Sequence, residues 1–145
     1  MDGELEEINN DIKAIEEEEN TVNKNMANMN KKVEKLERKH KERQRDLEQL
    51  EAEGVKYMQD KATIPAEHQE RFEAEKQQNI LERAKLGPEI YDIGKEIERT
   101  KEACKEEDLK KDEIWDRLAI KVRDRRLKEE KIVEVEVQLK SLPPQ

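Results

Sequence analysis

Apolar residues recur along the first third of the chain at alternating steps of three and four. The run comprises Leu5, Ile8, Ile12, Ile15, Val22, Met26, Met29, Val33, Leu36, Leu47 and Leu50. This spacing is a heptad repeat, abcdefg, in which the a and d residues form the apolar seam of a coiled-coil helix. With Leu5 at a, the repeat reaches Ile64 without a phase slip. The pattern therefore predicts a long helix over residues 2–64 that buries its seam against another helix.

Two proline-containing segments predict interruptions after this helix. Ile64–Pro65 disfavours continuation because the residue before proline avoids the helical conformation. Gly87–Pro88 combines a glycine suited to a helix C-terminus with a proline suited to a first helical turn. Residues 65–87 have a helical composition but a poor apolar stripe, so we expect short connecting helices there. A second long helix is predicted over 88–142, followed by a tail at 143–145.

The second long helix has a seam of its own. Its members are Ile90, Ile93, Ile97, Cys104, Trp115, Leu118, Val122, Ile132 and Leu139. Trp115 lies eleven residues after Cys104, an interval of one heptad plus a four-residue stutter. A stutter locally unwinds a supercoil. We therefore expect a second coiled-coil helix with one irregularity in its phase.

Two long helices separated by breakers favour an all-α fold in which the chain forms an elongated antiparallel helical hairpin. The predicted layers are Val22 with Val122, Met26 with Leu118, Glu19 with Arg125, His40 with Glu107, Arg43 with Cys104, Gly54 with Ile93 and Tyr57 with Ile90. In this register the polar seam residues of the first helix meet charged or titratable partners. An extended rod that pairs with another chain, and a three-helix zigzag, are the alternatives.

The composition excludes a wide globular core. Only 32% of the residues are hydrophobic and 47% are charged, against roughly 25% charged residues in a globular domain. Disordered chains share this composition but lack a sustained heptad period. The longest stretch without a charged residue, Asn25–Asn30, is far shorter than the roughly 20 residues of a membrane span. We expect no membrane association, no secretory signal, and a cytoplasmic or nuclear location.

The sequence shows no pattern of catalytic, metal-binding or cofactor-binding residues. The successive acids Glu16 to Glu19 point around a helix axis and do not converge on one ion. His40 and His68 lack cysteine or carboxylate ligands at metal-site spacing, and no glycine-rich phosphate loop or nucleophile motif is present. We therefore expect a non-enzymatic protein without a cofactor or a small-molecule substrate.

Two functional hypotheses follow from the charge and the periodicity. The first is a structural or scaffolding subunit that docks through its seams onto other coiled-coil proteins. In composition and periodicity the chain resembles coiled-coil subunits of cytoskeletal and ciliary assemblies. The second is a regulatory or nucleic-acid-associated binder that uses the basic stripes at 31–45 and 117–131. The net charge of -8 and the lack of aromatic residues within the stripes favour the first hypothesis.

Overall fold

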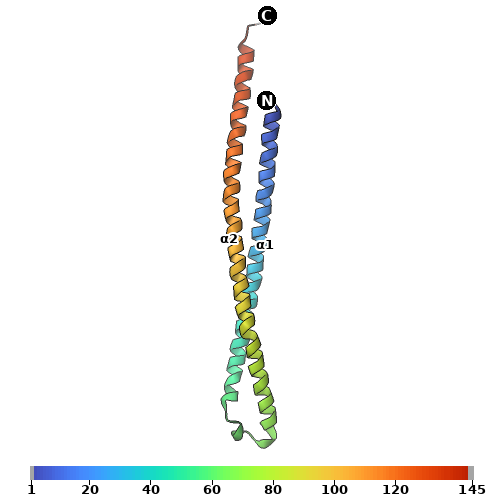
Figure 1. The fold of residues 1–145 in the computed structure, drawn as a ribbon, viewed down its shortest axis with the longest axis vertical. Helices are drawn as coiled ribbons and strands as arrows, with labels where there is room; N and C mark the ends of the chain where they lie inside the picture. The colour runs from blue at the N-terminus through green and yellow to red at the C-terminus, as the bar shows by residue number, and fades with distance from the viewer. Residues whose placement is uncertain (1, 144–145) are drawn as a thin grey trace. The chain divides into compact units, whose positions relative to one another are not determined.

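The computed structural model describes residues 2–143, and in that range every regular element is a helix. Helix α1 spans Asp2–Gly54 and helix α2 spans Gln69–Ser141 (Figure 1). Between them lie three short 3₁₀ helices, η1 (Val55–Met58), η2 (Lys61–Thr63) and η3 (Ala66–His68). The predicted all-α class is therefore confirmed for the described residues. Most of the predicted tail, residues 144–145, lies outside them.

The chain divides into two compact units, which are described separately. Unit 1 contains the described residues of Met1–Asn28 and Ala103–Gln145. In its ion pairs the residue number rises along α1 while it falls along α2: Glu4 pairs with Lys128, Asp11 with Lys121 and Glu18 with Arg117. The two helix segments of unit 1 are therefore antiparallel, and Figure 1 shows them side by side.

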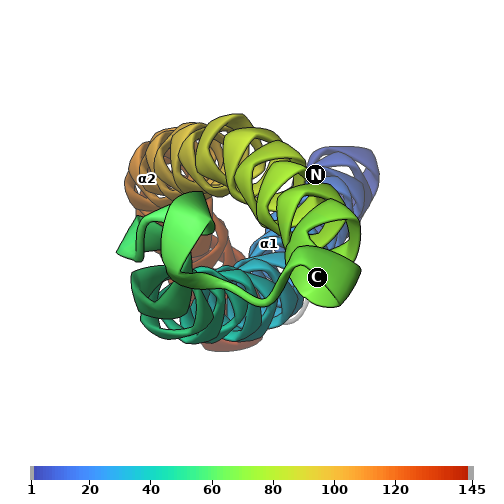
Figure 2. The same ribbon diagram turned by 90° about the horizontal axis from the view of Figure 1, so that it is seen from below.

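Unit 2, Met29–Glu102, contains the end of α1, the connector and the first part of α2. Its helix segments are also antiparallel, with contacts from Glu37 to Lys101, from Arg43 to Glu89, from Leu50 to Asn79 and from Tyr57 to Glu75. Figure 2 shows the connector passing from the end of α1 to the start of α2. Within the connector, the Asp60 carboxylate accepts a hydrogen bond from the Ala62 amide at 3.0 Å, which caps η2.

Burial along α1 and the residue that follows it has a seven-residue period. Every a and d position from Leu5 to Tyr57 is buried or half-buried, and the positions between them are exposed, with Asp11 as the one exception in that range. The most buried apolar residues are Ile12, Ile15 and Val22. The side of α1 that faces α2 is therefore the side on which its apolar residues recur.

Burial along α2 has the same period, without the predicted stutter. From Phe72 to Val135, buried or half-buried residues follow one another at alternating steps of four and three. Between Cys104 and Leu118 the phase passes through Glu107, Lys111 and Ile114. The predicted stutter is wrong. The apolar residues alone lead from Cys104 to Trp115, but the charged residues Glu107 and Lys111 occupy two of the seam positions between them.

The predicted break at Gly87–Pro88 is also wrong. Helix α2 is continuous through this dipeptide, with Pro88 inside it, and no glycine of the described residues has a positive φ. A proline within a helix lacks one amide donor and crowds the preceding turn. The flanking residues Leu86 and Ile90 are half-buried at seam positions. We attribute the continuity to this packing, which favours the helix on both sides of Pro88.

The connector lies earlier in the chain than predicted, and this changes the register. Helix α1 ends at Gly54 instead of residue 64, and α2 begins at Gln69 instead of residue 88. Each α1 residue therefore lies opposite an α2 residue of lower number than expected. Val22 belongs to a buried cluster with Ile15 and Ile114, so the predicted layer of Val22 with Val122 is wrong.

Replacing Gly87 by alanine tests the continuity of α2. Alanine favours a helix interior by roughly 1 kcal/mol over glycine, and a Cβ at Gly87 would meet no atom within 4 Å. We expect Gly87→Ala to raise the free energy of unfolding by about 0.5–1 kcal/mol, measured by chemical denaturation followed by circular dichroism. Gly54→Ala, whose Cβ would lie 3.0 Å from Asn79 Oδ1, should gain less. A lower stability for Gly87→Ala would indicate a helix end at this position.

Candidate functional site

The predicted seam residues of the first helix all lie at buried or half-buried positions. Those of the second helix divide into two groups. Ile93 is buried, and Ile90, Ile97, Cys104, Leu118 and Ile132 are half-buried. Trp115, Val122 and Leu139 are exposed, with exposed fractions of 50%, 40% and 62%. These three residues do not contribute to the packing of α2 against α1 in the way the sequence predicted.

The polar seam residues are half-buried or buried, but their predicted pairs are wrong. Arg43 Nε donates a hydrogen bond to Glu89 Oε1 at 2.9 Å instead of facing Cys104. His40 Nε2 lies 3.6 Å from the position that a Cβ on Gly94 would take, so its neighbour on α2 is Gly94 instead of Glu107. Arg117 pairs with Glu18, the residue next to Glu19. Glu19 therefore lies near Arg117 on α2 instead of Arg125. Each difference follows from the earlier connector.

Glu107 is a charged residue buried in the seam of unit 1. Lys110 Nζ donates a hydrogen bond to Glu107 Oε1 at 2.9 Å. This bond lowers the pKa of Glu107, with a further hydrogen bond from Asn25 of α1 acting in the same direction. The same bond raises the pKa of Lys110. The seam therefore contains an ionised carboxylate whose charge is balanced within α2 and which also contacts α1.

Asn79 is a second buried polar residue, which sequence reasoning did not single out as a site. Its exposed fraction is 5%, and its Nδ2 donates a hydrogen bond to the Leu50 carbonyl at 2.9 Å. A Cβ on Gly54 would approach Asn79 Oδ1 to 3.0 Å. The predicted layer of Gly54 with Ile93 is therefore wrong. The glycine instead leaves room for an asparagine that binds the last part of α1.

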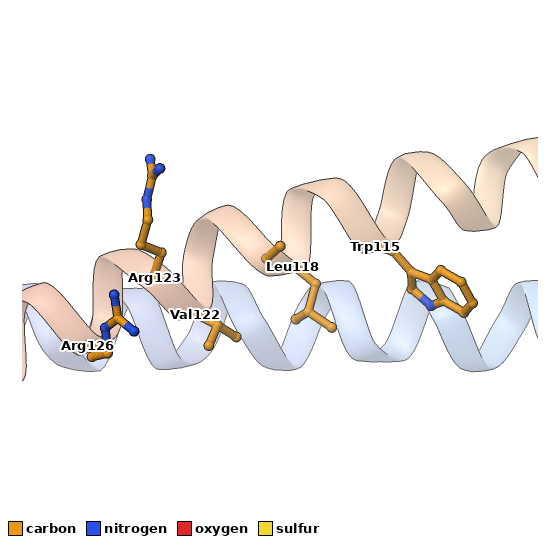
Figure 3. Close-up of a pocket in the computed structure, with 6 residues that line it drawn as sticks. Trp115, Leu118, Val122, Arg123 and Arg126 are labelled. Carbon is orange, nitrogen blue, oxygen red and sulfur yellow. The ribbon is translucent and has the colours of Figure 1, made fainter.

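Two of the exposed apolar residues of unit 1, Trp115 and Val122, lie one heptad apart and define a candidate docking surface, which we call the outer face of α2. It consists of exposed residues at helical spacing: Asp112, Trp115, Asp116, Ala119, Val122, Arg123 and Arg126. Figure 3 shows Trp115, Leu118 and Val122 pointing to one side of α2, with Arg123 pointing away from them. Leu118 joins the outer face to the seam, since it also packs against the buried cluster of unit 1.

Charges on the outer face are ordered along the helix. Asp112 and Asp116 lie at its start, Trp115, Ala119 and Val122 at its centre, and two arginines at its end. Arg126 also lies 3.8 Å from Glu130 of the same helix, at a site where both side chains are exposed. An exposed intrahelical pair of this kind contributes little stability and leaves the arginine able to bind elsewhere. Within residues 112–126 the outer face therefore combines an apolar centre with opposite charges at its two ends, and the exposed acids Glu129 and Glu130 follow it.

Sequence reasoning named Trp115 and Val122 but assigned them to the seam. The predicted stutter already indicated a separate face. Trp115 and Val122 share a seam with Cys104 only if the heptad phase shifts between them. Lys111 Nζ lies 5.0 Å from the centroid of the Trp115 ring. This cation–π contact covers part of the ring while half of the residue stays exposed.

The basic stripes are partly occupied by ion pairs within the units. Lys121 Nζ lies 3.1 Å from Asp11 Oδ2, and Lys128 Nζ lies 2.6 Å from Glu4 Oε2. Lys32 of the first stripe lies 3.0 Å from Glu96. The paired side chains keep between 37% and 59% of their surface exposed to solvent, so each pair contributes little to stability. They nevertheless place acidic side chains beside both stripes, which weakens the attraction of either stripe for phosphate.

The described residues contain no cluster of histidine, cysteine and acidic side chains that could hold a metal ion. Over the same range no helix is long and apolar enough to cross a lipid bilayer. Comparisons of the chain with protein-family models, with curated proteins and with solved structures return no match.

The buried Glu107 predicts a dependence of stability on pH. Its folded pKa lies below the ordinary value of 4.5, so ionised Glu107 stabilises the fold above that pH. This contribution is lost as the pH falls through the lowered pKa. We expect Glu107→Gln to be less sensitive than the original chain to acidification below pH 4.5, in thermal melts followed by circular dichroism. Glu106→Gln, at an exposed neighbouring position, controls for the loss of one carboxylate. Equal acid sensitivity of Glu107→Gln and the original chain would contradict this role.

Proposed function

We propose that the chain is a non-enzymatic structural subunit of a larger cytoplasmic assembly, and that it docks through the outer face of α2. The observation that carries the proposal is the exposure of Trp115 and Val122 on a helix whose seam is already packed against α1. Isolated exposed apolar residues are common, but an exposed tryptophan within an apolar stripe is typical of interaction surfaces. The sequence favoured docking through the seams, and the burial of the seam residues moves the proposed surface to the outer face.

The proposed architecture is one antiparallel coiled-coil hairpin. It is supported by the antiparallel pairing inside each unit and by the shared heptad phase of burial on α1 and α2. Such a hairpin would serve as a rigid helical spacer, as coiled-coil subunits of cytoskeletal or ciliary assemblies do. A partner that binds the outer face would leave the seam intact.

Nucleic-acid binding is the weaker alternative. It requires lysine and arginine side chains to be available along the basic stripes. Lys32, Lys121 and Lys128 instead lie within 3.1 Å of acidic side chains. The stripes also lack aromatic residues on which bases could stack. Balance of charge within the protein accounts for these residues more simply than a phosphate-binding role.

A cysteine pair tests the hairpin and its register together. In a Cys104→Ala background, Val22→Cys with Ile114→Cys should give an intramolecular crosslink with a short thiol reagent, because both positions belong to one buried cluster. The matched pair Val22→Cys with Val122→Cys should not, since Val122 lies on the outer face. The products are separated by electrophoresis and mass spectrometry. Exclusively intermolecular products from the first pair would contradict the hairpin.

Site-specific photocrosslinking in cells tests the docking surface. A photoreactive amino acid at Val122 should give a discrete adduct, and the same residue at the exposed position Glu113, off the outer face, should not. Mass spectrometry identifies the adduct. The identified protein, once purified, should bind the original chain and lose binding to Trp115→Glu, measured by calorimetry. Equal adducts at both positions, or none, would refute docking through the outer face.

A further inference from the structure

The outer face of α2 is self-complementary in an antiparallel sense. Counted from Ala119, Asp112 lies seven residues before it and Arg126 seven residues after it. Trp115 lies four residues before Ala119, and Arg123 lies four residues after it. A two-fold axis at Ala119 therefore brings the acidic start of one face against the basic end of the other. From this symmetry we propose that the partner at the outer face is a second copy of the chain.

The two-fold pairing matches large residues with residues that accommodate them. Trp115 of one copy would lie over Val122 and Arg123 of the other, so its ring gains an apolar neighbour and a guanidinium. Ala119 would face Ala119 across the axis, and small side chains there let two helices approach closely, since helix separation depends on the residues at the contact. Asp116 would lie beside Arg123 of the other copy. Each of these contacts occurs twice because the interface is isologous.

A parallel arrangement of two copies does not have this complementarity. It would place Asp112 against Asp112 and Arg126 against Arg126, which are repulsive contacts. A uniformly acidic partner helix would suit the arginines but would repel Asp112 and Asp116. The ordered charges on the outer face thus favour a second copy in antiparallel orientation over either alternative.

The proposed contact is short, which sets its expected strength. Residues 112–126 of a helix span about 21 Å, and a tryptophan buries on the order of 200 Å². Stable interfaces bury more than about 1,000 Å² in total. We therefore expect a reversible dimer whose dissociation constant is on the order of 10 μM. The inference rests on the proposed docking role and names the occupant of the docking surface.

Sedimentation equilibrium of the full chain tests the dimer. We expect a monomer–dimer equilibrium that Trp115→Glu shifts to monomer, with the dissociation constant raised about 100-fold or more. Ile120→Glu is the matched control, because Ile120 has a similar exposed fraction, 52% against 50%, and lies off the outer face. Circular dichroism verifies that each variant is helical. A monomeric original chain at concentrations of about 1 mM, or equal loss of the dimer in both variants, would overturn the proposal.

Charge exchange tests the orientation of the two copies. Asp112→Arg and Arg126→Asp should each weaken the dimer at low salt, because each variant creates two like-charge contacts. The double variant Asp112→Arg/Arg126→Asp should restore the dimer. Failure of the double variant to recover would overturn the antiparallel pairing.

The sedimentation and photocrosslinking results together separate this inference from the docking role. A monomeric chain that gives an adduct with a different protein at Val122 would overturn only the second copy as occupant. A monomeric chain with no adduct there would overturn both proposals.

Discussion

The burial of one apolar stripe of α1 against α2 is the interaction on which the rest of the structure depends. Hydrophobic residues make up only 32% of the chain, and the most buried of them, such as Ile12, Ile15 and Ile114, lie on this seam. Full burial of such a side chain stabilises a fold by roughly 1.5–3 kcal/mol. Exposed ion pairs between the helices contribute less than about 1 kcal/mol each. The seam therefore supplies most of the stability. It sets the register of the two helices, and the charged residues form the ion pairs that this register allows.

Polar residues within the seam make that register more specific. Asn79 donates a hydrogen bond to the Leu50 carbonyl. Gly54 leaves room for the Asn79 side chain, because it has no Cβ to crowd Asn79 Oδ1. Glu107 keeps its charge in the seam through a hydrogen bond with Lys110. A slip by one heptad would remove Asn79 from its acceptor and leave its amide buried without a partner, at a cost of about 1–3 kcal/mol. Similar polar residues at core positions specify register in coiled coils generally, at some cost in stability.

The outer face of α2 explains why this helix is harder to interpret from sequence than α1. A helix with a single apolar stripe shows one clear period, as α1 does. Helix α2 has seam residues such as Ile114 and also exposed apolar residues such as Trp115 and Val122 on another side. The two sets overlap at Leu118, so a single pattern through both requires a phase shift. The residues that obscure the seam are the same residues that make the outer face a candidate docking surface.

By itself the sequence determined the helical class and the side of α1 that is buried. These features depend on local spacing, because the heptad period defines a helix face without reference to the partner. Tertiary structure decided the continuity of α2 through Pro88, the register of α1 against α2, and which apolar residues remain exposed. The packing of Leu86 and Ile90 outweighs the local preference of Gly87–Pro88 for a helix end. Register depends on where the chain turns, and an apolar residue such as Trp115 is a seam residue only if α1 lies opposite it.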